Sequence, residues 1–357
     1  MKKLSELTLI VPSYGRHDYL LRLIDFWSNT PVRLKILDGS EHPCQEAARF
    51  CSNDRMSYYH LPFSIYERFA YASQLIDTPY AVFFGDDEFY VPSALCSCIR
   101  KIEQENLVAC GGLALAFYHH AGCVYGRKRY PEMKGLLNDS PDARSRIIKS
   151  VTPVVPSVIY AVHRSEVFKN NLKIFNHFDS SCPGTSEVQF TLMTCLQGAT
   201  RIINELYWLR SCENSSVATV DWDTQYHFHE WYKDPAKKEE VDSFFRGMLN
   251  AASCLPTLDL IEVHHWFEEA VNVYIQSKIE RKKNMRKADV ITHHSMALAR
   301  YLPSSITQII RPIYNKAMTK FGYDWHKEFK PISEAAAELT AEGTMVDFNQ
   351  LELIVEK

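Results

Sequence analysis

The chain has 357 residues, of which 46% are hydrophobic and 23% charged, a balance typical of a globular protein with a large buried core. Its formal net charge of -3 excludes the overall basic excess that phosphate neutralisation requires, so we expect no nucleic acid among its partners. The ten cysteines lack the Cys-x-x-Cys spacing of a zinc site, and we expect them to be reduced and mostly buried.

The first residues predict neither a secretory signal nor a membrane anchor. The apolar run from Leu7 to Val11 ends at Pro12 and is too short for the hydrophobic part of a signal peptide. No later window approaches the roughly 20 apolar residues that cross a bilayer. We therefore expect a cytoplasmic protein, in peripheral contact with a membrane at most.

Predicted strands and helices alternate along the first third of the chain. The strands are expected at residues 7–11, 32–37, 56–60 and 80–84. The helices are expected at residues 19–27, 43–51, 66–76 and 94–104. Such alternation predicts a parallel α/β sheet, in which ligands bind where the carboxyl ends of the strands open into loops. Polar residues 14–16, Asp38 and residues 86–88 each follow a strand directly, so we expect three strand ends to form one crevice.

The middle of the chain continues this pattern with longer connections. Further strands are expected at residues 107–116, 158–162 and 201–209, and a helix at residues 187–198. We interpret residues 122–143 as a loop that can cover a negatively charged ligand, because it carries Arg127, Lys128, Arg129 and Tyr130. After about residue 220 helical patterns dominate.

Three adjacent acids, Asp86, Asp87 and Glu88, are the sharpest local feature. Clustered carboxylates repel one another unless a cation compensates them, and oxygen ligands select a hard ion such as Mg²⁺ or Mn²⁺. The alternative is an exposed acidic turn that interacts with the N-terminus of the next helix.

Three motifs in order resemble those of family-2 glycosyltransferases. Residues 12–16, Pro-Ser-Tyr-Gly-Arg, are similar to the loop after that family's first strand, and residues 37–40, Leu-Asp-Gly-Ser, are similar to its Asp-Asp-Gly-Ser turn. Asp86-x-Glu88 stands where the family carries its Asp-x-Asp metal motif. The resemblance covers about residues 5–215 and is to enzymes of the bacterial surface-polysaccharide type. It implies the GT-A fold, a Rossmann-like αβα sandwich, here with a mainly helical C-terminal extension.

The resemblance also implies roles for single residues. Tyr14 would flank the donor base, Arg16 would reach the diphosphate, and Asp38 would accept a hydrogen bond from the base. Arg210 would pair with the diphosphate, the alternative being a surface salt bridge. The implied donor-binding set is Pro12, Tyr14, Arg16, Asp38, Arg68, Asp86, Asp87 and Arg210, with Asp86 and Glu88 as ligands of Mn²⁺ or Mg²⁺.

Glu187 matches the acid that opens a helix beyond the family's acceptor strand. The resemblance makes it the general base, which removes a proton from the acceptor hydroxyl during an inverting displacement. The alternative is that Ser186 caps the helix and Glu187 interacts with the helix dipole.

Histidines give two further expectations. His227 or His229 is a candidate to complete the metal shell, and the alternative is a structural histidine. The pairs His119-His120, His264-His265 and His293-His294 are expected to chelate poorly, because neighbouring side chains point apart.

Residues 278–287 carry six basic side chains against the single acid Glu280. Such a run is either a solvated helix face or a contact with anionic lipid or with a polyanionic acceptor.

We therefore predict a glycosyltransferase that moves a sugar from a nucleotide-sugar donor to a saccharide or lipid-linked acceptor. The expected domains are a catalytic domain at 1–220, with a donor half at 1–115 and an acceptor half at 116–220, and a helical region at 221–357 that can form a homodimer. The alternatives are a non-catalytic carbohydrate-binding or nucleotide-binding scaffold of the same fold, and a sugar-nucleotide pyrophosphorylase.

Overall fold

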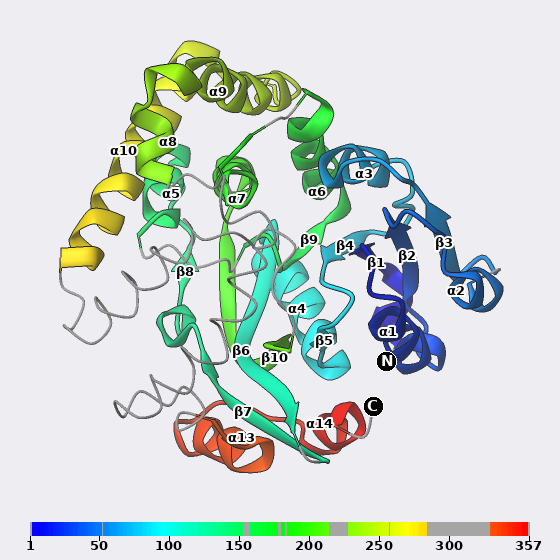
Figure 1. Ribbon diagram of the computed structural model, residues 1–357. Coiled ribbons are helices and arrows are strands. Elements are labelled where there is room, and N and C mark those ends of the chain that lie inside the picture. Colours follow the sequence, from blue (N-terminus) through cyan, green and yellow to red (C-terminus); the bar gives the residue numbers. More distant parts are fainter. Residues whose placement is uncertain are drawn as a thin grey trace, which may run out of the picture.

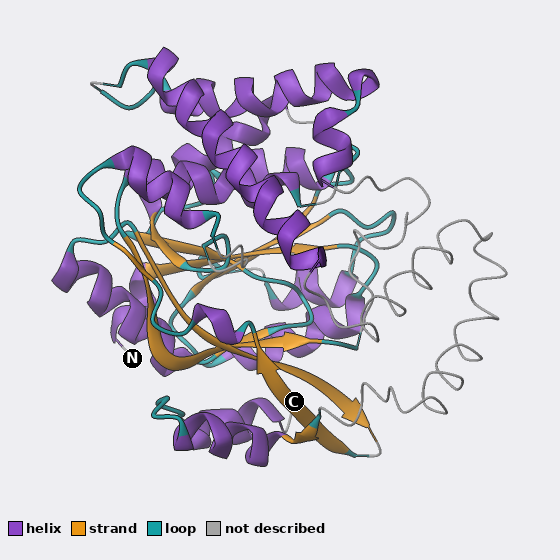
Figure 2. Ribbon diagram, turned by 90° about the vertical axis from the view of Figure 1, so that its left-hand side faces the viewer, coloured by secondary structure: helices purple, strands orange, loops and turns teal. Residues whose placement is uncertain are grey.

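A twisted sheet lies between two layers of helices in the computed structural model (Figures 1 and 2). The structure describes residues 2–51, 53–120, 122–152, 158–177, 180–182, 184–213, 228–256, 258–283 and 329–355. This arrangement confirms the predicted α/β class.

The sheet contains eleven strands within the described ranges, and its main path runs in the order β11-β7-β6-β9-β4-β1-β2-β3. These strands are β1 Leu7–Ser13, β2 Arg33–Asp38, β3 Met56–His60, β4 Tyr80–Phe83, β6 Ala109–His120, β7 Cys123–Arg129, β9 Val162–Arg164 and β11 Lys330–Pro331. Off this path lie β5 Phe89–Tyr90, β8 Leu137–Asn138 and β10 Thr200–Ser211. The strands β3, β2, β1 and β4 are parallel, β9 is antiparallel to β4 and β6, and β10 is parallel to β6.

The central strands are buried on both faces, which explains their continuous apolar sequences. In β1, Leu9 and Val11 belong to one core cluster, whereas Ile10 between them belongs to the other. In β4, Val82 and Phe83 divide in the same way. Successive side chains of a strand point to opposite faces, so a strand covered by helices on both sides needs apolar residues at every position.

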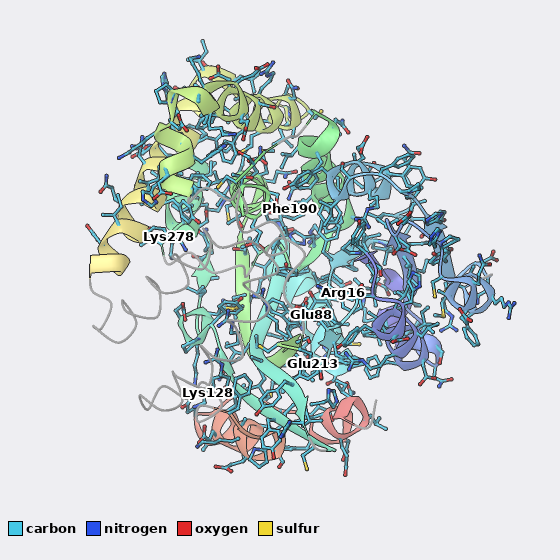
Figure 3. All side chains as sticks on the ribbon, in the orientation of Figure 1. Arg16, Glu88, Lys128, Phe190, Glu213 and Lys278 are labelled. Atoms are coloured by element: carbon cyan, nitrogen blue, oxygen red, sulfur yellow. The ribbon has the colours of Figure 1, made fainter. Side chains whose placement is uncertain are left out.

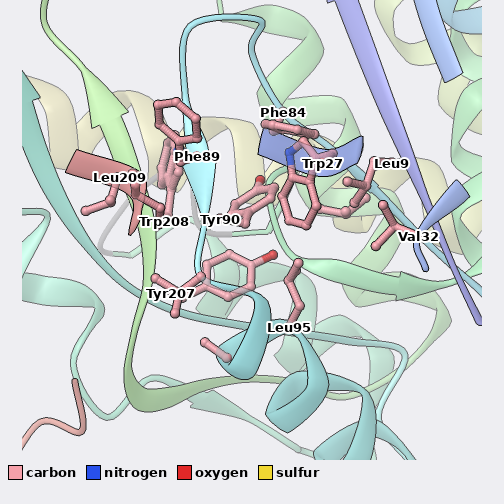
Figure 4. Close-up of a cluster of buried hydrophobic side chains, with 14 of the residues drawn as sticks. Leu9, Trp27, Val32, Phe84, Phe89, Tyr90, Leu95, Tyr207, Trp208 and Leu209 are labelled. Atoms are coloured by element: carbon pink, nitrogen blue, oxygen red, sulfur yellow. The ribbon is translucent and has the colours of Figure 1, made fainter. Parts of the chain in front are cut away.

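The first helical layer packs against the face that carries Leu9. It consists of η1 Lys2–Glu6, α1 His17–Ser28, α2 Gln45–Phe50 and α4 Pro92–Glu105. Helix α1 buries Leu20, Leu23, Ile24 and Trp27, whose spacing gives one apolar stripe. Trp27 meets Phe84 in this core, close to the pair Tyr90 and Tyr207 (Figure 4).

The second helical layer covers the opposite face. Its elements are α3 Ile65–Ala72, α5 Ala143–Ser150, α6 Ser165–Leu172, η3 Lys173–His177, α7 Thr185–Gln197, α8 Phe228–Lys233, η6 Pro235–Lys237, α9 Lys238–Ala252 and α10 Leu260–Lys283. Phe83 of the sheet packs on Phe168 and Phe190, and Trp231 of α8 extends the same cluster.

The region after residue 220 contributes to both layers. Helices α8, α9 and α10 belong to the second layer, whereas α13 Ile332–Ala341 and α14 Phe348–Val355 pack on the first through Ile332 and Leu351. Strand β11 also adds to the sheet by pairing with β7. No helix in the described part of the chain is both long enough and apolar enough to cross a bilayer.

Two predictions of local structure were wrong. Residues 123–129, predicted as loop, form β7, because hairpin pairing with β6 stabilises an extended segment whose polar side chains hide the strand pattern. Residues 158–160, predicted as strand, form a turn, and β9 begins only at Val162. The cysteines are mostly buried, as predicted, since seven of the ten are buried.

Candidate functional site

The three polar loops after β1, β2 and β4 are joined by hydrogen bonds. The Gly39 N–H donates to the Ser13 carbonyl at 2.9 Å, and the Gly15 N–H donates to Ser40 Oγ at 2.8 Å. Ser13 Oγ donates to Asp86 Oδ2 at 2.7 Å. The loops at the carboxyl ends of these three strands therefore converge, as predicted, and Pro12 lies near the end of β1.

Asp38 is the last residue of β2 and is fully buried. Its Oδ1 accepts the Ser40 N–H at 2.9 Å, and its Oδ2 accepts the Tyr58 hydroxyl at 2.5 Å. Burial and the bond to Asp38 both raise the pKa of Tyr58, so the phenol stays protonated as the donor. Asp38 thus fixes the shape of the second loop.

Arg68 ties the ends of β1 and β2 together from below. Its Nη1 donates to the carbonyls of Ser13 and Leu37, each at 2.7 Å, and burial lowers its pKa. A Cβ at position 39 would lie 2.5 Å from Arg68 Cζ, which explains the glycine there. Arg68 therefore binds backbone in this structure, whereas Tyr14 is 54% exposed above it.

Arg16 bridges the first two acids of the cluster. Its Nη1 lies 3.3 Å from Asp86 Oδ1 and 3.2 Å from Asp87 Oδ2. Burial raises the pKa of Asp86 to about 6. The hydrogen bond from Ser13 and the charge of Arg16 favour the ionised form and oppose this shift. The acids are not an exposed turn, because all three side chains of residues 86–88 are buried.

Glu88 is held by two residues of β10. Trp208 Nε1 donates to Oε2 at 2.9 Å, and Arg210 Nε lies 3.8 Å from Oε1. Burial raises the pKa of Glu88 to about 7, and the charge of Arg210 opposes this shift. The Glu88 carboxylate is thus oriented through Oε2, with Oε1 toward the Arg210 guanidinium.

The chemistry of these acids fits a hard cation. Asp86 and Glu88 offer only oxygen, and their burial without full compensation favours a bound positive charge. Across the described ranges, no third ligand atom of His, Cys, Asp or Glu joins them within 4.8 Å. A cation here would take its other ligands from water or from a bound phosphate.

Of the two histidines predicted to complete the metal shell, the structure describes one. His229 belongs to α8, with Nε2 3.8 Å from Glu230 Oε1, and His227 lies outside the described residues. His264 and His265 approach Glu268 one turn later on α10, and the three ligand atoms lie within 4.8 Å of one another. Both rings approach Glu268 because it stands three and four residues after them on the helix. That this adjacent pair chelates poorly stays a prediction.

A cavity of about 520 Å³ opens beside Glu187. It is lined by Arg127, Lys128, Arg129, Tyr130, Pro131, Glu132, Ser150, Val151, Gly184, Glu187, Val188, Thr191, Arg210, Tyr274 and Lys278. Arg210, which lies 3.8 Å from Glu88, therefore lines the same cavity as Glu187. Figure 3 shows Lys278 of α10 well apart from Arg16 and Glu88, across the molecule.

Glu187 lies in the first turn of α7, as predicted. The helix begins after Gly184, whose φ of +80° suits glycine, and Ser186 lies inside the helix, so Ser186 is not its cap. Burial raises the pKa of the half-buried Glu187, and the Lys278 ammonium opposes this shift. The ammonium that opposes the shift comes from α10, one of the C-terminal helices.

Tyr160 was not predicted as a site residue. Its ring stacks on Trp208 at 4.7 Å between centroids. Burial, then the charges of Glu187, Glu88 and Asp87, raise the pKa of its phenol. Tyr160 therefore packs on the indole that binds Glu88, and no spacing in the sequence marks it, because a turn places it there.

Comparison with known proteins gives a structural likeness. No protein-family model matches the chain, and no curated protein sequence matches it. The structure of S. aureus TarS 1–349 in complex with UDP-GlcNAc is similar, with a TM-score of 0.53 and 11% identity over 79% of this chain and 76% of that one. TarS 1–349 alone and with UDP give TM-scores of 0.46 and 0.45 at 11% and 10% identity, each over 79% of this chain and 92% of that one. The first of these confirms that the chain has the predicted fold, that of a GT-A-type glycosyltransferase.

Proposed function

We propose that this protein transfers a sugar from a nucleoside-diphosphate donor to a hydroxyl of a saccharide or lipid-linked acceptor. One observation carries the proposal. Arg210 lies 3.8 Å from Glu88 and also lines the cavity that Glu187 lines, so one side chain connects the buried acid cluster with the space beside the candidate base. The fold is that of a structure which holds UDP-GlcNAc, and this supports a nucleotide sugar as the donor.

The donor would bind in the crevice formed by the three loops. Tyr14, exposed above it, offers an aromatic face to the base, and Asp38 keeps the loop in place through Ser40. Arg16 and Arg210 stand on opposite sides of the acid cluster, and each can pair with diphosphate oxygens.

A divalent cation would be held by Asp86 and Glu88. When bound, such an ion neutralises charge on the departing diphosphate. Ser13 and Trp208 each donate to one oxygen of these carboxylates and so orient the other oxygen. Mn²⁺ and Mg²⁺ both suit the oxygen donors.

Glu187 would act as the general base in an inverting displacement. The acceptor oxygen forms a bond to the anomeric carbon while the bond from that carbon to the diphosphate oxygen breaks. The proton of the acceptor hydroxyl passes to a carboxylate oxygen of Glu187. The raised pKa of this half-buried acid suits proton uptake, and Lys278 keeps the carboxylate ionised beforehand.

A screen of UDP, GDP, CMP and dTDP sugars with Mn²⁺ tests the proposal. Thermal stabilisation reports binding, since a ligand of the folded state raises the apparent stability, and release of nucleotide reports turnover. UDP sugars come first because TarS was crystallised with UDP-GlcNAc. If no nucleotide binds, the transferase proposal fails. Binding without turnover on any acceptor would favour the scaffold instead.

Two associations predicted from the sequence also belong here as proposals. Contact with an anionic membrane through residues 278–287 is checked by liposome co-sedimentation, which should weaken with salt. Of that run the structure describes residues 278–283, and Lys278 lines the cavity, whereas residues 284–287 lie outside the described part. Homodimerisation is checked by light scattering after size-exclusion chromatography.

A further inference from the structure

The cavity beside Glu187 has strongly basic walls. Five basic side chains line it, against two carboxylates. The five basic side chains come from three separate elements, namely β7, β10 and α10. Like charges gathered around one space destabilise a protein unless an anion shares that space.

The basic side chains of β7 alternate between the two faces of the strand. Arg127 and Arg129 are two positions apart and therefore point to the same face of the strand. Lys128 between them pairs with Glu342, which directly follows α13. Its Nζ also lies 3.9 Å from Oε2 of Glu338 within α13. Arg129 forms no ion pair with any described residue, and its guanidinium lies 4.6 Å from the Tyr130 ring.

The C-terminal segment holds this basic strand in place. β11 pairs with β7 through Lys330 opposite Gly126, and Ile332 approaches so closely that a Cβ at Gly126 would lie 3.0 Å from it. The Arg127 guanidinium lies 4.9 Å from the Phe329 ring. The cations are therefore ordered before a ligand arrives, which lowers the entropy lost on binding.

The position of this cavity separates it from the donor crevice. Of the predicted donor-binding residues, only Arg210 lines it, and Tyr14, Arg16 and Asp38 do not. The basic residues of β7 and Lys278 therefore provide positive charge beyond the crevice where the donor diphosphate would lie, on the side of Glu187. Tyr130 and Tyr274 also line this side.

We infer that this cavity binds an acceptor that carries an anionic group, phosphate or carboxylate, close to the hydroxyl that is glycosylated. The inference rests on the proposed function, because it takes Glu187 as the group that faces this hydroxyl. Arg127, Arg129 and Lys278 would hold the anion, and guanidinium groups suit its oxygens through paired hydrogen bonds. The acceptor class is thus a phosphorylated or acidic saccharide.

Calorimetric binding with UDP and Mn²⁺ saturating the donor crevice tests this inference. The probes are a panel of hexose 6-phosphates, the parent hexoses, the corresponding hexuronates and inorganic phosphate. The phosphorylated or acidic sugar should bind at least about tenfold more tightly than its neutral parent, because charge-assisted hydrogen bonds are the stronger ones. That preference should shrink as salt is raised.

Variants locate the binding. Arg129→Gln and Lys278→Met should each reduce the affinity for the charged sugar about tenfold and leave UDP affinity within about twofold. Lys149→Ala removes a charge from the exposed side of α5, outside this cavity, and is the matched control that should change neither.

The outcomes separate the inference from the proposed function. Equal binding of charged and neutral sugars, absence of binding by every charged sugar, or an unchanged preference in both cavity variants overturns the inference while the function stands. Inorganic phosphate binding as tightly as the hexose phosphates also overturns it, since the site would then hold a free anion. If UDP itself fails to bind, the proposed function fails.

Discussion

Trp208 donates its indole N–H to Glu88 across a buried space, at 2.9 Å between Nε1 and Oε2. The same indole stacks on Tyr160, at 4.7 Å between ring centroids. One side chain of β10 therefore orients the third acid of the cluster and packs against the ring of Tyr160. Its replacement should affect both donor binding and stability.

Trp208→Phe keeps an aromatic ring but removes the donor to Glu88. We expect the free energy of unfolding to fall by about 2 kcal/mol, because a buried carboxylate oxygen loses its partner. Metal-dependent nucleotide binding should weaken about tenfold. Calorimetry and chemical denaturation measure the two effects. Trp231→Phe, which removes an indole donor to Glu240 far from the crevice, should lower stability alone. Equal nucleotide affinity in Trp208→Phe and Trp231→Phe would contradict the role of the Trp208 indole in donor binding.

Glu88→Gln removes the charge of the candidate metal ligand and keeps its shape. We expect Mn²⁺ to stop improving nucleotide binding, because the neutral amide is a weak ligand for a hard ion. Titration of the nucleotide with and without Mn²⁺ measures this difference. Glu213→Gln, which alters a carboxylate paired with Arg22, is the control and should keep the metal effect. Persistence of that effect in Glu88→Gln would exclude Glu88 as a ligand.

Glu187→Gln should leave nucleotide binding intact and lower kcat by at least about 100-fold, since the amide cannot take up the acceptor proton. Nucleotide release in the presence of an acceptor is the measurement. Glu132→Gln changes the other carboxylate of the same cavity and should retain most activity. Full turnover by Glu187→Gln would rule out its role as the base.

Lys278→Met should move the acid limb of the kcat profile to higher pH. The Lys278 ammonium lowers the pKa of Glu187, so its loss raises that pKa. A base works only when it is deprotonated, and the rate is lost as the pH falls through its pKa. Activity of the variant should therefore disappear at a higher pH than that of the parent. Lys278→Arg keeps the charge and should keep the parent profile, and an unmoved acid limb in Lys278→Met would refute this coupling.

Glu240 connects the C-terminal helices to the segment before α7. Its Oε2 accepts the Ser181 N–H at 2.9 Å and the Trp231 indole at 2.9 Å, and its Oε1 lies 2.8 Å from Lys237 Nζ. Burial would raise its pKa, but the bonds from Lys237, Ser181 and Trp231 outweigh burial and lower the pKa to about 2. The ionised form is therefore the stabilising one.

Glu240→Gln should lower the free energy of unfolding by about 1 kcal/mol at neutral pH. The contribution of an acid with a lowered pKa is present above the unfolded value of about 4.3 and is lost as the pH falls towards the folded value. The difference between parent and variant should therefore shrink between about pH 4 and pH 2. Denaturation at several pH values measures it, and Asp242→Asn, in an exposed pair with Lys238, is the control. A difference that is constant with pH would contradict the role of the charge.

Local patterns in the sequence were enough to predict the sheet and its loops. The apolar runs of β1, β2 and β4 predict buried parallel strands, and Asp38 and Asp86 follow two of those strands directly. Helix α7 begins close to its predicted start and carries Glu187 in its first turn. These features depend on periodicity and on the chain direction of a strand, which neighbouring residues determine.

Tertiary packing alone decided how these residues are used. Asp38 and Arg68 have the residue types of a donor site, yet burial turns their hydrogen bonds toward Ser40 and the strand ends. The strand character of β7 depends on pairing with β6, and the cavity depends on Lys278, which approaches Glu187 from a helix much later in the chain. The sequence by itself determined which segments form strands and helices and which acids follow them. Only the packing of distant elements decided which side chains surround Glu187, because such contacts have no local periodicity.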